Sequence, residues 1–535
     1  MKKLFTLALV LCLALSMAAP AMAETEQKII YQMSNEPQYM DPTLNEFEEG
    51  AQVHMNLFRG LYKFDQSNNL VPAMAEGYTL SEDETVYTFT LRDGLVWSDG
   101  SPLTAYDFEF TYKRIADPAN ASATCYELYC IKNVEKLFNG LDDSLTLDDV
   151  GVKALDEKTL EITLEAPTPW FISLTASSAF LPVCKAALET YGEEWVKNPE
   201  TYVCNGPFMP KEFYPNEKFV LVKNPNYYEA DNVKLETLEY VFLNAAETAL
   251  LAYENGEIDV LYDVNADAEA RYTGTPDMFS QGKIGMRFYH MNCKSEALQD
   301  PRVRQALTIS IDRKILVENV LQSDYEPLYG YIPHAFPDIV EPEKGWREVN
   351  GNVFEEDVER AKELLAEAGY PNGEGLPTIR LCSTPTASLV KVAQAMQAMW
   401  KQNLGIDVEV VTYETGVYWT KVNDESDFDI AYTGNTGSYL DPLSLLVNFT
   451  TAKCYENGSD CDNEVYDGYV AQLQAGISGQ EREEVLRLAE QELFNTCPIL
   501  PVYSYTTLRL VKPYVKGFQV NYGGHANFEY AYVEK

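Results

Sequence analysis

The stretch 86–114 constrains the fold most, because it predicts three kinds of local structure within one short span. It reads VYTFTLRDGLVWSDGSPLTAYDFEFTYKR. Apolar and threonine residues alternate over 87–91, which is the two-residue period of a half-buried strand. Two Asp-Gly turns follow, and Thr104 with Asp107 three residues later predicts a capping box at a helix start. A proline after Asp117 ends that helix. These patterns predict strand, turn and helix, but no activity.

The same stretch carries a family resemblance. Residues 97–108, WSDGSPLTAYDF, are similar to the W-S-D-G-x-P-x-T-A-x-D-F signature of the extracytoplasmic solute-binding proteins of peptide and nickel ABC importers. Shorter phrases of that family recur along the chain: G-V-K-A at 151–154, N-G-P-F at 205–208, N-P-x-Y at 224–227, G-E-I-D at 256–259 and L-V-K-P at 510–513. The resemblance implies an α/β, bilobal periplasmic-binding-protein-like fold with an extra strand-rich lobe inserted near the N-terminus.

The resemblance also implies a discontinuous division of the chain into lobes. Lobe I takes 24–58, 186–285 and 507–535, the inserted lobe II takes 59–185, and lobe III takes 286–506. Lobe III has independent support in the residues, because the strand patterns 378–381, 406–411 and 428–433 alternate with helical patterns such as 389–401. Such alternation is typical of a parallel, wound α/β unit.

The first 23 residues predict a secretory signal. Lys2 and Lys3 precede an apolar run too short to span a bilayer comfortably, and Ala21-Met22-Ala23 offers small residues for cleavage. Cys12 does not predict a lipid anchor, because bulky Leu11 precedes it. A net charge of −41 argues against nucleic acid and anionic membrane as partners. We therefore expect an exported protein, in the periplasm or on the extracytoplasmic face of a bacterial envelope.

Export permits disulfides, although cysteines are sparse in this chain. Cys454 and Cys461 flank a turn-rich segment, which predicts a small bridged loop between them. Weaker candidate pairs are Cys125 with Cys130 and Cys184 with Cys204. No C-x2-C pair occurs, so a structural zinc site is not expected.

The segment 434–442, GNTGSYLDP, is the first candidate for a ligand contact. It follows a predicted strand of the wound lobe, and ligands bind beyond the carboxyl ends of such strands. It resembles the family loop G-W-x-x-D-Y-x-D-P. In the family, the main chain of this loop pairs with an extended peptide, and its first Asp forms an ion pair with the peptide's α-ammonium group. The resemblance makes Gly434, Asn435, Thr436 and Ser438 candidates, with uncharged Ser438 in place of that Asp. A plain glycine-rich turn is the structural alternative.

The family's second strand-pairing segment corresponds to Glu46-Phe47-Glu48. Loop carboxylates are more often simply solvated. Because Ser438 has no charge, we expect Glu46 or Glu48 to balance a ligand ammonium. The alternative is a ligand without a free amino group at that point.

Three further candidates follow from the resemblance. Tyr432 stands where some relatives place an Arg that pairs with a ligand carboxylate, and Lys421 is a candidate substitute, although a solvated lysine is the plainer interpretation. Tyr126 is near an aromatic position of the family's cleft, and a core tyrosine is an equal alternative.

The resemblance thus implies a monomeric, cofactor-free receptor that captures an oligopeptide and delivers it to an ABC-transporter membrane permease. The alternative keeps the receptor and changes the cargo to a nickel chelate, haem, an opine or a sugar. An exported hydrolase is disfavoured, because the chain has no H-E-x-x-H, G-x-S-x-G or P-loop motif and its four histidines are scattered. No metal site is expected.

Overall fold

The structure is a computed structural model, and it describes residues 25–453 and 458–535. The predicted signal sequence 1–23 and Cys454 lie outside the described residues. In the part of the chain that is described, no helix combines the length and the apolar character that crossing a bilayer demands.

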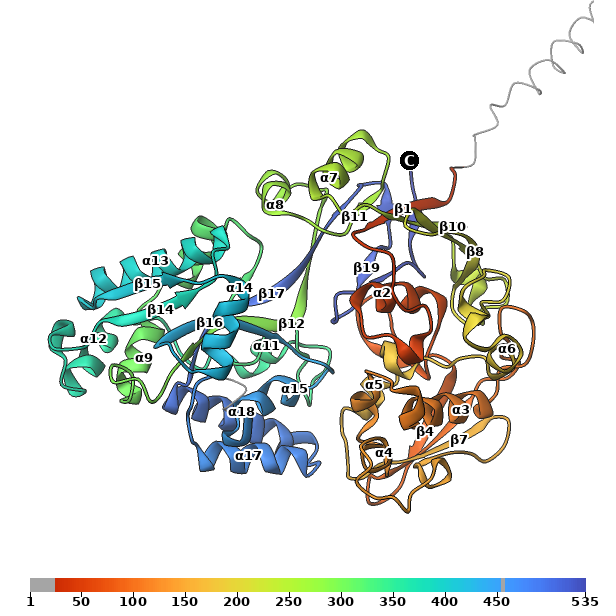
Figure 1. The fold of residues 1–535 in the computed structure, drawn as a ribbon, viewed down its shortest axis with the longest axis horizontal. Helices are drawn as coiled ribbons and strands as arrows, with labels where there is room; N and C mark the ends of the chain where they lie inside the picture. The colour runs from red at the N-terminus through yellow and green to blue at the C-terminus, as the bar shows by residue number, and fades with distance from the viewer. Residues whose placement is uncertain (1–24, 454–457) are drawn as a thin grey trace, which may run out of the picture.

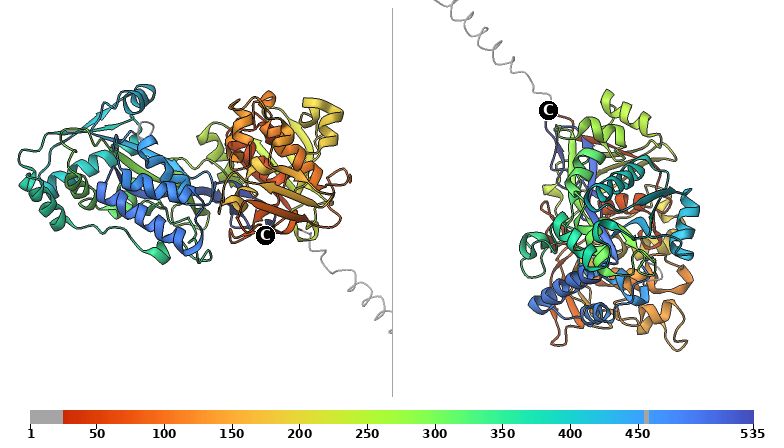
Figure 2. Two further views of the ribbon diagram at one scale, coloured as in Figure 1. Left: turned by 90° about the horizontal axis from the view of Figure 1, so that it is seen from below. Right: turned by 90° about the vertical axis from the view of Figure 1, so that its left-hand side faces the viewer.

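The chain forms two bodies that lie side by side and are joined by a narrow connection (Figures 1 and 2). We call residues 25–277 and 511–535 the terminal body, since both ends of the described chain lie there, and residues 286–504 the wound body. Hydrophobic side chains form one large buried cluster in the terminal body and two in the wound body, and a smaller fourth cluster packs around residues 249–268. The predicted two-lobed α/β architecture is confirmed.

One mixed sheet of eleven strands runs through both bodies. Its order is β15-β14-β16-β12-β17-β11-β1-β10-β9-β8, with β13 also paired to β17. The bounds are β1 Lys28–Met33, β8 Phe208–Tyr214, β9 Lys218–Lys223, β10 Thr237–Phe242, β11 Val260–Leu261, β12 Met278–Met291, β13 Glu326–Pro327, β14 Ile379–Ser383, β15 Val408–Thr412, β16 Ile430–Thr436 and β17 Ile499–Val511.

The two long antiparallel strands β12 and β17 form the connection between the bodies. The first part of β12, 278–282, pairs with 506–510 of β17 beside the terminal body, and 286–290 pairs with 499–504 in the wound body. Their register shifts between Gly282 and Met286. The ladder is thus irregular at the crossing, where Figure 1 shows both strands passing from one body to the other.

The stretch 86–114 folds as predicted. β5 (Val86–Leu91) lies inside a four-stranded sheet of order β4-β5-β7-β6, with β4 Ala75–Leu80, β6 Val152–Ala154 and β7 Thr159–Thr163. α3 (Ala105–Ala116) begins after Thr104, whose main-chain N–H donates to the Asp107 carboxylate at 2.9 Å. The apolar face of this sheet belongs to the same buried cluster as β1 and β10, so the inserted segment packs as part of the terminal body.

The remaining elements surround these sheets. The terminal body adds α2 Glu48–Leu57, α4 Val134–Phe138, α5 Phe171–Leu174, α6 Lys185–Tyr191, α7 Ala246–Asn255, α8 Ala266–Tyr272 and the short strands β2 Tyr62–Phe64, β3 Leu70–Pro72, β18 Val515–Lys516, β19 Gln519–Val520, β20 Ala526–Asn527 and β21 Tyr532–Val533. The wound body adds α9 Pro301–Ile309, α10 Arg313–Ile315, α11 Trp346–Asn350, α12 Val358–Glu367, α13 Ala387–Leu404, α14 Thr415–Trp419, α15 Leu443–Leu446, α17 Glu464–Gln474 and α18 Gly479–Thr496.

The wound body confirms the predicted parallel strands. β14 pairs in parallel with β15 on one side and β16 on the other, and α13 connects β14 to β15. Two parallel neighbouring strands need a long crossover connection, usually a helix, and the segment between β14 and β15 is long enough to form one. The division into three lobes with the stated boundaries stays a prediction.

The predicted Cys454–Cys461 disulfide is wrong. Cys461 bonds to Cys293, with the two Cα atoms 5.4 Å apart and 168 positions between them in the chain. The Cys293 main-chain N–H donates to the Ser459 carbonyl at 2.8 Å, which places the 459–461 segment beside the end of β12. The partner of Cys461 is therefore determined by the packing of its segment against the distant strand β12, and not by the short distance in sequence to Cys454. The cysteines of both weaker candidate pairs are free thiols.

Candidate ligand-binding site

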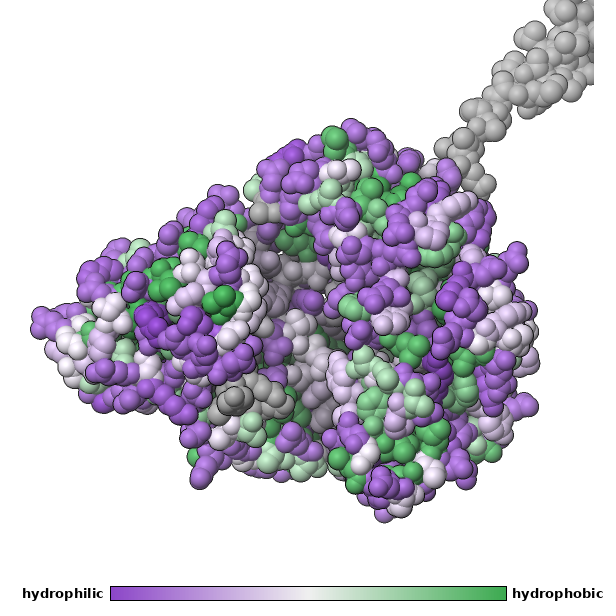
Figure 3. Space-filling view, in the orientation of Figure 1, coloured by the Kyte–Doolittle hydropathy of each residue, from purple (hydrophilic) through white to green (hydrophobic). Residues whose placement is uncertain are grey.

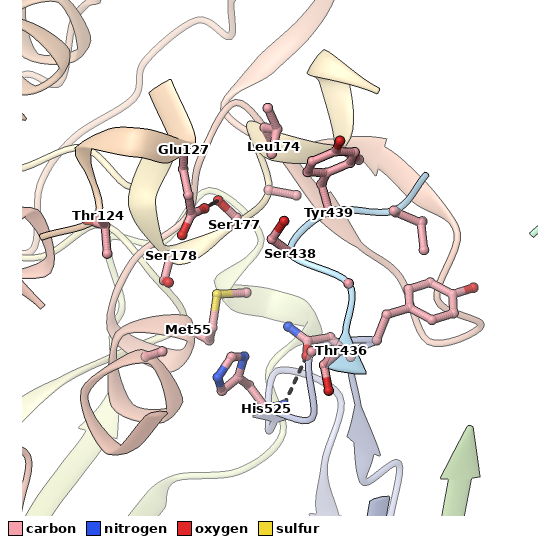
Figure 4. A pocket seen from close by; sticks show the side chains of 18 of the residues that line it. Met55, Thr124, Glu127, Leu174, Ser177, Ser178, Thr436, Ser438, Tyr439 and His525 are labelled. Carbon is pink, nitrogen blue, oxygen red and sulfur yellow. Dashed lines mark hydrogen bonds between the residues drawn. The ribbon is translucent and has the colours of Figure 1, made fainter. Parts of the chain in front are cut away.

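A cleft of about 270 Å³ lies between the two bodies (Figures 3 and 4). Residues 45–48, 124–127, 173–178 and 521–525 contribute to its terminal-body side. Residues 436–440 of the wound body and Ile284 of the connection contribute to the other side. A change in the separation of the bodies would therefore change the shape of this cleft.

The predicted segment Glu46-Phe47-Glu48 lines the cleft. It stands at the start of α2, with all three side chains exposed. The preceding turn is fixed by Asn45, whose side-chain amide donates to the Phe47 carbonyl at 2.9 Å. The Phe47 ring stacks on Tyr39, with ring centroids 6.0 Å apart. These contacts present two carboxylates and a segment of main chain to the cleft.

His525 pairs with one of these carboxylates and was not predicted. Its Nε2 lies 2.8 Å from a Glu48 carboxylate oxygen, and this hydrogen bond lowers the pKa of Glu48 to about 2. The neighbouring Ala526 is held to α2 by both groups of the Gln52 amide, at 2.9 Å and 2.7 Å. This C-terminal contact is 477 positions from Glu48 in sequence, so no local pattern signals it.

The opposite wall begins at the end of β16, which extends further than predicted. Gly434 pairs with Arg287, and Thr436 pairs with Gly285. Gly434 and Asn435 therefore lie in the sheet and not among the residues that line the cleft, whereas Thr436 and Ser438 line it. The space beside Gly434 is taken by the Tyr505 hydroxyl, so its missing side chain serves packing rather than approach to a ligand.

The loop after β16 is supported from behind. Asp441 accepts hydrogen bonds from Nε and Nη2 of Arg482 at 2.9 Å and 2.8 Å, and both side chains are buried. The Arg482 guanidinium lies 4.9 Å from the Trp170 ring, which itself stacks on Tyr439. The backbone of 436–440 is thus fixed to α18 and touches the terminal body.

Tyr126 lines the cleft as an exposed ring, and its neighbour Glu127 is an unpredicted lining residue. Both lie in a short 3-10 helix (Cys125–Leu128) whose two end residues are buried. The Ser177 hydroxyl donates to the Glu127 carboxylate at 3.3 Å. Burial raises the pKa of Glu127 to about 7. Among the described residues, no Lys, Arg or His forms an ion pair with this carboxylate.

Tyr432 and Lys421 lie away from the cleft lining. The Tyr432 ring is buried, with its centroid 5.0 Å from that of Tyr418 and 5.3 Å from the Arg287 guanidinium. Lys421 Nζ lies 2.7 Å from the Asp427 carboxylate, so its charge already has a partner. Their roles toward a ligand carboxylate stay predictions.

Within 25–453 and 458–535, no group of three or more His, Cys, Asp or Glu side chains is arranged to hold an ion.

Two α/β bodies that are joined by two strands and enclose a cleft define a solute-binding protein of the hinged type. The family model for "Bacterial extracellular solute-binding proteins, family 5 Middle" matches residues 69–457. This chain belongs to that family, and the resemblance of the 97–108 signature is confirmed.

Three relatives illustrate the family. The periplasmic murein peptide-binding protein MppA of Escherichia coli is 32% identical over 96% of this chain and 95% of its own length. The oligopeptide-binding protein OppA of Bacillus subtilis is 32% identical over 94% of this chain and 92% of its own. The probable deoxycholate-binding periplasmic protein YgiS of Escherichia coli is 30% identical over 93% and 91%.

A solved structure of MppA, in its unliganded open form, covers 95% of this chain and 98% of its own at 31% identity, with a TM-score of 0.84. A second structure of the Escherichia coli MppA gives a TM-score of 0.68. This chain therefore superposes more closely on that unliganded open form than on the second structure.

Proposed function

We propose that this chain is the substrate-binding receptor of an ABC importer, and that it captures an oligopeptide in the cleft between its two bodies. One observation carries the proposal: the cleft has loop main chain on two opposing sides, at 45–48 and 436–440. A peptide contributes N–H and C=O groups along its whole length, so it can bind both loops as an added strand.

The loops have main-chain donors available for such pairing. Within the described residues, the N–H groups of Glu46, Ser438 and Tyr439 donate to no protein acceptor. Main-chain recognition gives affinity with little dependence on side chains. Glu46, Phe47, Glu48, Tyr126, Thr436 and Ser438 are the predicted contacts that we retain for the ligand.

A non-peptide solute is the second candidate, because relatives of similar identity differ in the ligands for which they are named. A nickel chelate, haem, an opine or a sugar would use the same cleft and the same motion. These solutes lack a repeating backbone, so the two facing loops would have less to pair with. We therefore place the oligopeptide first.

Delivery requires that the permease distinguish the loaded receptor from the empty one. Bending at the β12–β17 crossing would bring the bodies together around a ligand, and closure of this kind is a common signal in two-body receptors. The receptor acts as an exported monomer, binds a membrane permease and carries out no catalysis. This role needs no cofactor.

Small-angle X-ray scattering tests the proposal. The protein is first unfolded and refolded to remove any carried ligand, and then mixed with a random library of tripeptides and tetrapeptides. Binding between the bodies predicts a smaller radius of gyration with the library, and no change with free amino acids. An unchanged radius at saturating peptide would contradict the proposal.

A further inference from the structure

We infer that Glu127 is the residue that recognises a positively charged amine of the ligand. The inference rests on the proposed function, and it adds a specificity-determining residue to the cleft. The chemical class is a primary ammonium group, which either a peptide's amino terminus or a lysine-like side chain supplies.

The position of Glu127 is the first argument. It lines the cleft from the terminal body, and Ser438 lines it from the wound body. Figure 4 shows the Glu127 carboxylate and the hydroxyls of Ser177, Ser178 and Ser438 around the same space. An ammonium group has three N–H donors and no acceptor. One carboxylate with several hydroxyl oxygens is therefore a matching set of acceptors.

The electrostatics of the cleft are the second argument. Glu48 already has His525 as its partner at 2.8 Å, and the Glu46 side chain is exposed. Glu127 is more buried than either, and its polar partner in the described chain is the neutral Ser177 hydroxyl. A partly buried carboxylate without a cation is costly when ionised. A ligand cation would remove that cost, which favours charged amines over neutral ligands.

The groups that face Glu127 define how binding should respond to pH. Besides Glu127, the titratable groups that line the cleft are Glu46, Glu48, Tyr126, Tyr439, Tyr522 and His525. Burial raises the pKa of Glu127 to about 7, and an adjacent ammonium would lower it again. Binding of an amine near neutral pH should therefore release a proton from this carboxyl group.

The test compares wild type with Glu127→Gln, which keeps the shape of the side chain, and with Glu135→Gln as a matched control on an exposed carboxylate of α4 that does not line the cleft. Each refolded protein is mixed with two libraries of tripeptides and tetrapeptides, one with free and one with acetylated amino termini. Captured peptides are eluted and identified by mass spectrometry. Proton release is measured by titration calorimetry in buffers of different ionisation enthalpy.

Wild type and Glu135→Gln should capture free peptides roughly tenfold better than acetylated ones, a ratio equivalent to about 1.4 kcal/mol. Glu127→Gln should lose both this preference and the proton release. Acetylated peptides that wild type captures only when they contain lysine would identify the side-chain amine as the recognised group. A Glu127→Gln protein that keeps the wild-type preference would overturn the inference. Capture of neither library by wild type would overturn the peptide function itself, and this inference with it.

Discussion

The rings of Trp170 and Tyr439 stack with centroids 5.2 Å apart and planes inclined by only 11°. Trp170 precedes α5 in the terminal body, whereas Tyr439 belongs to the cleft loop of the wound body. The stack therefore links the two bodies directly beside the candidate ligand site. A contact placed there couples the position of the loop to the position of the opposite body.

The first prediction concerns this stack. Trp170→Ala should weaken ligand binding, because the 436–440 loop loses an aromatic contact and the Arg482 guanidinium loses the ring beside it. Aromatic pairs contribute about 0.5–1.5 kcal/mol beyond burial, so we expect a several-fold rise in Kd. Trp170→Phe, which preserves a stacked ring, should bind nearly as wild type does. Equal Kd values for the alanine and wild-type proteins would show that the stack does not support the loop.

The second prediction concerns the buried pair Asp441–Arg482. Asp441→Asn leaves the Arg482 charge without its carboxylate in a site that is fully buried on the Arg side. Loss of one partner of a buried ion pair costs about 3–5 kcal/mol, so chemical denaturation should show a fall of that order in the free energy of unfolding. The double variant Asp441→Asn with Arg482→Met should recover much of the loss, because no unpaired charge remains. A single variant as stable as wild type would be inconsistent with this account.

The third prediction is a pH dependence of stability that arises from Glu127. Its folded-state pKa of about 7 lies above that of an unfolded chain, near 4.5. Between these values the folded state binds the extra proton, so this group makes stability fall as pH rises, and the penalty is complete above pH 7. In the ligand-free protein, Glu127→Gln should be more stable than wild type by about 1–3 kcal/mol at pH 8.

Thermal and denaturant unfolding at pH 4, 6 and 8 check this sign. At pH 4 the carboxyl group is protonated in the folded state and mostly protonated in the unfolded chain, so the two proteins should then be nearly equal in stability. A variant that is less stable than wild type at pH 8 would mean that Glu127 stabilises the ligand-free fold instead.

The fourth prediction concerns the Cys293–Cys461 disulfide. Removal of a native disulfide typically costs about 2–4 kcal/mol, so Cys293→Ser and Cys461→Ser should each lower the free energy of unfolding by that order. Cys454→Ser should retain the bond. Non-reducing peptide mapping checks the pairing directly, and a fragment that joins Cys454 to Cys461 would contradict the structure.

Sequence patterns predicted the elements that depend on near neighbours. The strand over 87–91, the capping box at Thr104 and the parallel β14 and β16 all follow from local periodicity and turn chemistry. The 46–48 and 434–442 segments were placed by family resemblance, and most of their residues line the cleft, although Gly434 and Asn435 do not. Local reasoning worked wherever the deciding contacts lie within a few residues.

The missed residues depend on contacts between distant segments. His525 reaches Glu48 only because the C-terminal segment returns to α2, and Cys293 reaches Cys461 only because β12 ends beside 459–461. Glu127 lies in the short 3-10 helix Cys125–Leu128, which is too short to show a periodic pattern. Its surroundings come from the distant 173–178 segment, where the Ser177 hydroxyl donates to its carboxylate and Ser178 also lines the cleft. A pattern in a single sequence does not show which residues from distant segments will lie next to one another.

The central claim is that the cleft carries an oligopeptide, and native mass spectrometry of the protein as purified tests it most directly. The spectrum should show the polypeptide together with a series of added masses, and collisional release should give fragments that sequence as short peptides with free amino termini. The same preparation of Glu127→Gln should carry far less of this series. A single added mass that fragments as a metal complex, a sugar or another non-peptide compound would contradict the claim.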